Sequence, residues 1–185
     1  FMRDILNFFT KFDPLMWYTF HSATRIYVKT PESKTVIPTR YHEKVIVQLE
    51  IGTRGFAHQS SSNDFRKKSD RRVLYVGRFT YWKGGHLALL AFSKALQELP
   101  DIRLTMVGRG PEESTWRKIA LAEGIDHAID WIPWVSQQEL GSIYKSHDIF
   151  LFPSLHDSSG NVVLESLAHS LPVVCLDLGG PSVIV

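Results

Sequence analysis

The sequence predicts an α/β fold built on a doubly wound parallel sheet, preceded by a partial α/β domain. From residue 73 onward, short runs of continuous apolar residues alternate with segments of helical apolar spacing. Strands that are apolar on both faces are typical of parallel sheets covered by helices on both sides. In addition, 44% of the 185 residues are hydrophobic and 12% are aromatic, which is enough to bury a sizeable core.

Each element of this second part has its own signal. Apolar runs predict strands at 73–76, 102–107, 128–132, 149–153 and 173–176. Helices are expected between them, at 84–99, 111–123, 136–145 and 160–169. The first helix takes its apolar spacing from Leu87, Leu90, Ala91, Ala95 and Leu99. Ser136 and Glu139 predict a capping box at the start of the third helix.

The first 57 residues are less regular. They contain a helical opening and two strand-like runs, 23–28 and 44–51. Thr30 followed by Pro31 predicts a helix start, with Thr30 as the N-cap. The aromatic opening, residues 1–20, can be interpreted as an interfacial membrane helix. Packing on other protein is the favoured interpretation, because Pro14 interrupts the stretch.

A change in composition separates the two parts. Residues 58–72, HQSSSNDFRKKSDRR, contain Phe65 but almost no other apolar side chain, which is typical of a linker or an exposed loop. We therefore expect 1–57 to be the incomplete end of one domain, 58–72 a linker, and 73–185 a second domain. Both ends of the chain look cut, so we expect the second domain to be truncated at its C-terminus.

Composition excludes several classes of protein. The 21 Lys and Arg nearly balance 19 Asp and Glu, for a formal net charge of +2, whereas a nucleic-acid binder is usually more basic. The single cysteine, Cys175, excludes an internal disulfide and a multi-cysteine zinc site. We expect a cytoplasmic protein without a membrane span. The H-E-x-x-H and G-x-S-x-G motifs are missing, which excludes the corresponding hydrolases.

Two loops that follow strands carry glycines and cations. Gly77 permits a turn, while Arg78 and Lys83 provide positive charge beside a helix N-terminus, as a diphosphate requires. The alternative is that both cations are ordinary solvated charges. Gly108 and Arg109 repeat this pattern more weakly, and a plain turn is favoured for Arg109.

The loop at 153–165 has the strongest signal. Ser158, Ser159 and Gly160 allow a ligand to approach the N-terminus of the next helix. Glu165 stands where a carboxylate can accept hydrogen bonds from sugar hydroxyls. The alternative is that Asp157 is a helix N-cap and Glu165 a solvent-facing charge.

These motifs together resemble the nucleotide-sugar-binding half of glycosyltransferase family 4, retaining enzymes of GT-B fold. The matching pattern is V-G-R, four residues and K-G; V-G-x-G-P; P-S, an acidic residue, seven residues and Glu; then L-P-V-V and G-G-P. The resemblance spans about 110 residues, 73–185, in the same order and spacing. It extends weakly to residues 1–57, which would be the end of the acceptor-side domain.

The resemblance implies roles for individual residues. Arg78 and Lys83 would hold the donor diphosphate and stabilise it as it leaves, and Glu165 would bind the ribose hydroxyls. Asp157 would contact the transferred sugar, where the family usually has Glu. Catalytic roles are thus implied for Asp157, Arg78 and Lys83. Donor binding is implied for Gly77, Arg78, Lys83, Gly108, Ser158, Ser159, Gly160, Asn161 and Glu165. Backbone N–H groups of residues 159–161 would face the sugar or the distal phosphate.

The implied function is transfer of a sugar from a nucleotide-diphosphate sugar to an acceptor hydroxyl, with retention of configuration. The acceptor would be a saccharide or a lipid-linked saccharide in polysaccharide, lipopolysaccharide or glycolipid synthesis. Peripheral association with the inner face of the membrane remains open, and no nucleic acid is implied. No two aspartates are separated by one residue, so the Asp-x-Asp metal pair is missing and no metal or other cofactor is expected.

Two alternatives remain, and several residues have two interpretations. The chain is either a donor-binding half or a non-catalytic nucleotide-sugar-binding module, and another GT-B activity such as a sugar-nucleotide epimerase is a third possibility. We expect the chain by itself to be inactive. Trp131 and Trp134 either flank the base or pack in the core. An exposed imidazole is expected for His86 and His169.

Overall fold

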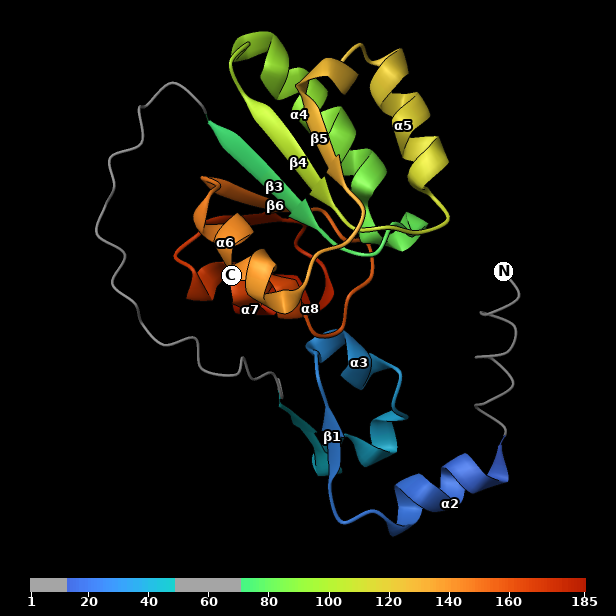
Figure 1. Ribbon diagram of the computed structural model, residues 1–185. Helices are drawn as coiled ribbons and strands as arrows, with labels where there is room; N and C mark the ends of the chain where they lie inside the picture. Colours follow the sequence, from blue (N-terminus) through green and yellow to red (C-terminus); the bar gives the residue numbers. More distant parts are fainter. Residues whose placement is uncertain (1–12, 49–70) are drawn as a thin grey trace. The chain divides into compact units, whose positions relative to one another are not determined.

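The computed structural model describes residues 13–48 and 71–185 (Figure 1). The chain divides into two compact units at residues 50 and 51. The predicted opening at 1–12, most of the linker at 58–72 and the end of the second strand-like run lie outside the described residues. Within the described ranges, no helix is long and apolar enough to cross a membrane.

The first unit contains a small parallel sheet. Helix α2 (Pro14–Ser22) precedes β1 (Ile26–Val28), and α3 (Pro31–Thr35) and the 3₁₀ helix η1 (Thr39–Lys44) lead to β2 (Val45–Val47). Strands β1 and β2 pair in parallel. Thr30 caps α3 as predicted, because its hydroxyl accepts a hydrogen bond from the backbone N–H of Ser33.

Pro14 begins helix α2. Residues 1–12 lie outside the described part of the chain, so the interruption of the aromatic opening at Pro14 stays a prediction. The side chain of Asp13 accepts a hydrogen bond from the backbone N–H of Leu15 and caps α2. Proline fits at this position because the first N–H groups of a helix have no partner within the helix.

The second unit is the predicted doubly wound sheet. Its order is β5-β4-β3-β6-β7, and every pairing is parallel. The strands are β3 (Arg72–Val76), β4 (Arg103–Val107), β5 (Ile129–Ile132), β6 (Ile149–Phe152) and β7 (Val173–Cys175). Helices α4 (Gly85–Glu98) and α5 (Glu113–Ala122) cover one face, and α6 (Gln137–Lys145), α7 (Asn161–Ala168) and α8 (Gly179–Ile184) lie on the other (Figure 1). The chain first adds β4 and β5 on one side of β3 and then returns to add β6 and β7 on the other side. Because crossovers between parallel strands are right-handed, this reversal places the later helices on the opposite face of the sheet.

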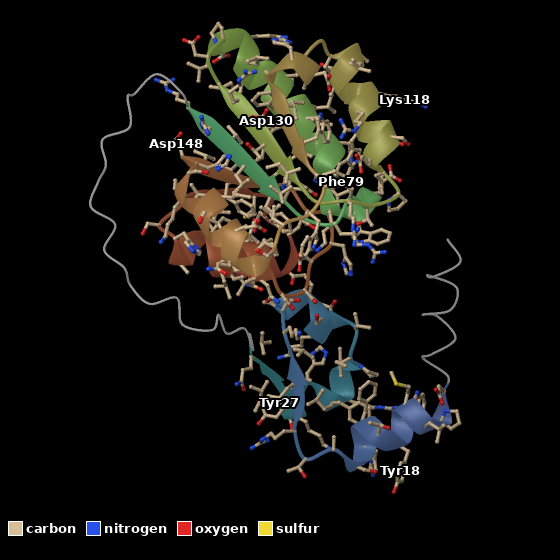
Figure 2. All side chains as sticks on the ribbon, viewed as in Figure 1. Tyr18, Tyr27, Phe79, Lys118, Asp130 and Asp148 are labelled. Carbon is tan, nitrogen blue, oxygen red and sulfur yellow. The ribbon has the colours of Figure 1, made fainter. Side chains whose placement is uncertain are left out.

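Aromatic side chains fill the core on the α4–α5 face. Trp116 of α5 is fully buried and meets the ring of Tyr75 edge-on at 5.9 Å, and its centroid is 4.7 Å from that of Phe79. Phe79 lies just past the carboxyl end of the sheet (Figure 2). The apolar core therefore continues into the loop after β3 and fixes the start of that loop.

Two details of the second unit differ from the sequence prediction. The buried face of α4 consists of Ala88, Leu89 and Phe92, whereas Leu90 is 41% exposed and Leu99 42% exposed. Because residues 87–92 are all apolar, spacing alone does not select the buried face. In addition, residues 179–184 form α8, a helix that the sequence analysis did not predict and where it named only the G-G-P motif.

Gly84 lies where the loop after β3 packs against the loop after β6, and this contact can be tested with a matched control. Its φ is +69°, and a Cβ there would lie 1.8 Å from the carbonyl oxygen of Pro153. Gly124 has a φ of +70° but nothing within 4 Å of such a Cβ. We expect Gly84→Ala to lower the free energy of unfolding by more than about 3 kcal/mol, and Gly124→Ala by about 1 kcal/mol. Urea unfolding measures both, and equal losses would contradict the close contact at Gly84.

Candidate functional site

The candidate site lies at the point where the sheet reverses its strand order. Strand β3 is flanked by β4 and β6, so the chain leaves β3 and β6 on opposite faces of the sheet. In open α/β sheets, ligands bind outside the carboxyl ends of the strands at this point. The two loops concerned are residues 77–84, after β3, and residues 153–160, after β6.

Backbone and hydroxyl groups hold these two loops together. The carbonyl oxygen of Trp82 accepts a hydrogen bond from the backbone N–H of Leu155 at 2.8 Å and another from the hydroxyl of Ser154 at 3.1 Å. From the core side, the buried hydroxyl of Tyr75 donates to the carbonyl oxygen of Lys83 at 3.0 Å. Sequence reasoning missed Trp82 and Tyr75, because an aromatic residue in such a loop or strand gives only a packing signal.

Gly77 and Gly108 bring the loops after β3 and β4 into backbone contact. The N–H of Gly77 donates to the carbonyl oxygen of Val107, and the N–H of Gly108 to that of Ile132. Gly108 has a φ of +145°, and a Cβ there would lie 1.9 Å from the carbonyl oxygen of Gly77. These two predicted residues therefore shape the backbone at the carboxyl edge of the sheet.

Lys83 and Asp157 form an ion pair across the two loops. The Nζ atom of Lys83 lies 2.5 Å from Oδ2 of Asp157, and the two side chains are 23% and 13% exposed. The other carboxylate oxygen, Oδ1, accepts hydrogen bonds from the backbone N–H groups of Ser159 at 3.0 Å and Gly160 at 2.9 Å. Asp157 thus binds its own loop, and two of the three N–H groups expected to face a sugar or phosphate donate to its carboxylate.

Two opposing effects act on the pKa of Asp157, namely burial and the groups that bind its carboxylate. Burial by itself raises the pKa of the carboxyl group, but the hydrogen bonds from Gly160, Lys83 and Ser159 and the charge of Lys83 outweigh burial, so the pKa lies below its ordinary value. The carboxylate is therefore ionised at neutral pH.

Further contacts fix the same loop to α8. The carbonyl oxygen of Asp157 accepts a hydrogen bond from the backbone N–H of Gly180 at 2.7 Å. A Cβ on Gly180 would lie 2.7 Å from the backbone of Ser158. The G-G-P segment therefore packs closely against the loop after β6.

The remaining predicted donor-binding residues are more exposed. Arg78, Ser158 and Asn161 lie at the surface of the loops and of the α7 N-terminus, and Arg78 has no ion pair within the described part of the chain. Glu165 lies on α7 and is half-buried, and the hydroxyl of Tyr144 on α6 donates to its Oε2 at 3.1 Å. Glu165 is thus not a purely solvent-facing charge. Sequence reasoning missed Tyr144 because the spacing of α6 marks it only as a core residue.

The tryptophan and histidine residues with two interpretations can now be placed. Trp134 is 67% exposed. Trp131 is half-buried, its Nε1 donates to Asp126 at 3.3 Å, and the guanidinium of Arg117 lies 4.6 Å from its ring.

An exposed imidazole was the wrong expectation for both His86 and His169. The ring of His86 stacks on Tyr81 at 4.8 Å. His169 stacks on Tyr144 at 5.3 Å, and its Nδ1 lies 2.8 Å from the carbonyl oxygen of Glu165. Both rings pack against neighbouring aromatic residues, which helical spacing does not reveal.

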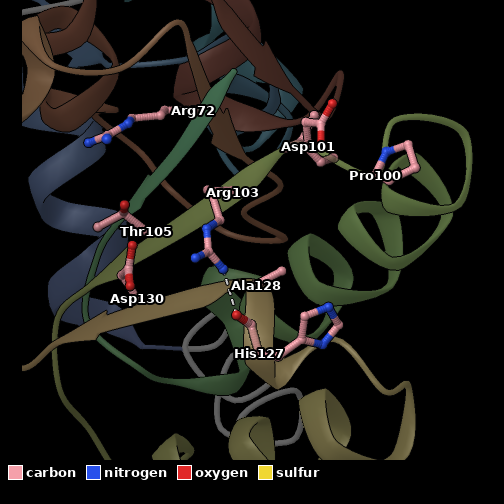
Figure 3. A pocket seen from close by; sticks show the side chains of 9 residues that line it. Arg72, Pro100, Asp101, Arg103, Thr105, His127, Ala128 and Asp130 are labelled. Carbon is pink, nitrogen blue, oxygen red and sulfur yellow. Dashed lines mark hydrogen bonds between the residues drawn. The ribbon is translucent and has the colours of Figure 1, made fainter. Parts of the chain in front are cut away.

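A hollow of about 470 Å³ lies at the opposite edge of the sheet (Figure 3). Arg72 and Arg103 are register partners at the amino ends of β3 and β4, and Nη1 of Arg103 donates to the carbonyl oxygen of His127. Asp101 and Asp130 also line the hollow, so its charges are mixed. It is distant in the fold from the loops described above. Among the described residues, no cluster of three His, Cys, Asp or Glu side chains is arranged to hold a metal ion.

Comparison with known proteins identifies the family. Residues 58–185, more than half of the chain, match the family model described as glycosyl transferases group 1. The chain belongs to this family. It is 33% identical over 148 residues to a D-inositol 3-phosphate glycosyltransferase of Pseudarthrobacter chlorophenolicus, which covers 73% of this chain and 35% of that protein. It is also 32% identical over 111 residues to an uncharacterized glycosyltransferase of Methanocaldococcus jannaschii, with 60% of this chain and 28% of that protein covered.

Solved structures confirm the fold of this group 1 glycosyltransferase chain. The crystal structure of Anabaena HepE in complex with UDP matches 90% of this chain and 48% of its own, with a TM-score of 0.70 and 18% identity. The C-terminal domain of a group 1 glycosyl transferase from Francisella tularensis matches 62% and 63%, with a TM-score of 0.56 and 24% identity. The chain spans about a third of the length of the curated relatives it matches. The prediction of a Rossmann-like α/β fold of the GT-B type is therefore confirmed.

The Asp157 contacts make the stability of this chain depend on pH. Because the folded-state pKa is lowered, the carboxylate stabilises the fold above the unfolded-state pKa of about 4 and stops doing so as pH falls through the folded-state pKa. We expect Asp157→Ala to lower the free energy of unfolding by about 2 kcal/mol at pH 7, and the difference from wild type to shrink below about pH 4. Urea unfolding at several pH values measures this, and a difference that stays constant down to pH 2 would contradict it.

Proposed function

We propose that this chain is the donor-binding half of a retaining glycosyltransferase of family 4, which uses a nucleotide-diphosphate sugar. Residues 73–185 would bind the donor, and residues 1–57 would be the end of the acceptor-side domain, joined by the linker at 58–72. The observation that carries the proposal is the convergence of Lys83, from the loop after β3, with the loop before α7 at the switch point of the sheet. Family membership supports the transferase class.

The donor diphosphate would bind between these loops. Arg78 is exposed on the loop after β3, and Lys83 lies two residues before the first residue of α4. Lys83 is therefore near a helix N-terminus, which favours an anion. Phosphate oxygens would share Lys83 with Asp157 or replace Asp157 as its partner. Glu165 would accept hydrogen bonds from the ribose. Anabaena HepE was solved with UDP and glucose, and a pneumococcal O-GlcNAc transferase with UDP and GlcNAc, which supports a nucleoside diphosphate as the probe.

Transfer with retention would need little covalent chemistry from the protein. The bond between the anomeric carbon and the leaving diphosphate breaks, and the acceptor oxygen bonds to the same face of that carbon. The acceptor proton passes to an oxygen of the diphosphate. Arg78 and Lys83 would lower the barrier because they bind charge that grows on the diphosphate in the transition state. The expectation that no metal or other cofactor takes part is carried into this proposal as a prediction.

For the acceptor, the proposal names only a class of molecule. We infer a saccharide or lipid-linked saccharide acceptor in lipopolysaccharide, polysaccharide or glycolipid synthesis, at the inner face of the membrane in the cytoplasm. A lipopolysaccharide core glycosyltransferase of Rhizobium meliloti is 32% identical over 109 residues, which supports this class. On helix α2, Leu15 and Tyr18 are 75% and 72% exposed, which is compatible with peripheral membrane association.

A second candidate, a nucleotide-sugar-binding module without transfer activity, is favoured by one observation. Both carboxylate oxygens of Asp157 already have partners within the chain, so this side chain is less free to contact a sugar. The same donor binding is expected of both candidates, and only transfer to an acceptor separates them.

Donor binding is testable by thermal stability. UDP or GDP at a hundredfold its dissociation constant should stabilise the full chain by about 2.7 kcal/mol, or roughly 10 °C in melting temperature. Lys83→Ala and Glu165→Ala should each weaken the stabilisation. Lys118→Ala, which removes an exposed lysine from α5 (Figure 2), should leave it unchanged. Equal shifts in wild type and both site variants would contradict the proposed site.

Retention of configuration can be tested from the anomeric configuration of the product. When the chain, expressed together with the remainder of its gene, transfers a sugar from an α-linked nucleotide sugar, we expect an α-linked product. The anomeric coupling in the proton NMR spectrum distinguishes the two configurations. A β-linked product formed directly from that donor would contradict a retaining mechanism, and binding without transfer would favour the module.

A further inference from the structure

The carboxylate of Glu165 is held by a buried hydroxyl from a different helix. Tyr144 lies on α6 and is 2% exposed, and its hydroxyl is 3.1 Å from Oε2 of Glu165 on α7. The carbonyl oxygen of Val162 is a more distant acceptor at 3.4 Å. Because β6 separates the two helices in the chain, this contact depends on tertiary packing and not on local sequence.

The ring of Tyr144 has little freedom to aim its hydroxyl elsewhere. His169 stacks on one side at 5.3 Å with 22° between the planes, and Phe150 meets the ring nearly edge-on at 5.9 Å and 70°. Nδ1 of His169 lies 2.8 Å from the carbonyl oxygen of Glu165, so the stacked ring is itself attached to the residue that Tyr144 holds. These contacts direct the hydroxyl of Tyr144 toward the side-chain oxygen of Glu165.

The hydroxyl also stays protonated. Burial, followed by the neighbouring Glu165 charge and hydrogen bond, raises the pKa of Tyr144 far above its ordinary value. At neutral pH, Tyr144 is therefore a permanent hydrogen-bond donor, and its hydroxyl engages Oε2 of Glu165 from the core side. The other oxygen is left to accept from a ligand. A carboxylate that is already oriented loses less side-chain freedom when it binds.

We propose that Tyr144 is a positioning residue, which holds Glu165 in the orientation that accepts hydrogen bonds from the ribose hydroxyls of the donor nucleotide. The inference rests on the proposed function, in which Glu165 binds the ribose. It adds α6 to the helices that shape the site, since Tyr144 would then contribute to nucleotide recognition through Glu165.

The test compares ribonucleotides with 2′-deoxyribonucleotides by isothermal titration calorimetry on the full chain. The probes are UDP and GDP, each paired with its 2′-deoxy analogue. We expect wild type to bind a ribonucleotide about tenfold more tightly than its deoxy analogue, because the analogue lacks the 2′-hydroxyl that donates to the Glu165 side chain. Tyr144→Phe keeps both ring contacts and removes only the hydroxyl, and should reduce this ratio to about two- or threefold.

A double mutant shows whether Tyr144 acts through Glu165. In the Glu165→Ala background, adding Tyr144→Phe should not reduce the ratio further. Tyr75→Phe is the matched control, because Tyr75 is also fully buried and its hydroxyl donates to the backbone of Lys83. It should weaken ribo- and deoxyribonucleotides equally and leave their ratio unchanged.

Three results would overturn the inference. An unchanged ratio in Tyr144→Phe, with nucleotide binding intact, would make Tyr144 a packing residue only and leave the proposed function standing. A further decrease in the Glu165→Ala background would mean that Tyr144 acts independently of Glu165. If wild type binds neither UDP nor GDP, the proposed function fails, and the inference fails with it.

Discussion

The parallel pairing of β3 with β6 is the constraint on which the site depends. Helices α4, α5 and α6 and strands β4 and β5 separate these strands in the chain order, yet Val73 pairs with Ile149 and Leu74 with Phe150. The pairing places the loop after β3 directly beside the loop after β6. The carbonyl oxygen of Trp82 then satisfies two donors from the second loop, so the loops have a fixed relation without any ligand.

Within this frame, the charges of the site are held in a preorganised state. The Nζ atom of Lys83 pairs with Asp157 and lies over the ring of Phe152, 5.6 Å from its centroid, while Arg78 remains exposed on the same loop. A cation that is already positioned does not need to be ordered when an anion arrives, although it must exchange or share its carboxylate partner. In the proposed donor site, Asp157 would compete with a phosphate for Lys83, whereas the fixed position of Lys83 would reduce the entropy lost when the phosphate binds.

The sequence predicted the order and type of the elements because short apolar runs and helix caps are local signals. Ser136 and Glu139 form the predicted capping box, and each strand of the second unit lies within a residue or two of its expected range. In the first unit, β1 and β2 are shorter than the predicted runs 23–28 and 44–51. What it did not predict depends on distant contacts. The buried face of α4 is chosen by the sheet and by Trp116, and Tyr144 meets Glu165 only after α6 and α7 have packed. The grouping of Lys83 with Asp157 likewise follows from strand order, which no single motif encodes.

The residue at position 157 shows how one methylene alters the balance between loop structure and ligand contact. Aspartate readily accepts hydrogen bonds from N–H groups two and three residues later, and Asp157 does so with Ser159 and Gly160. The longer glutamate, expected here from the family resemblance, is less suited to this local bond and reaches further from the backbone. With aspartate, the loop is tied to itself, to Lys83 and to Gly180. If this loop binds a sugar, as proposed, the hydroxyls that approach Asp157 would compete with the backbone N–H groups and with Lys83 for its carboxylate oxygens.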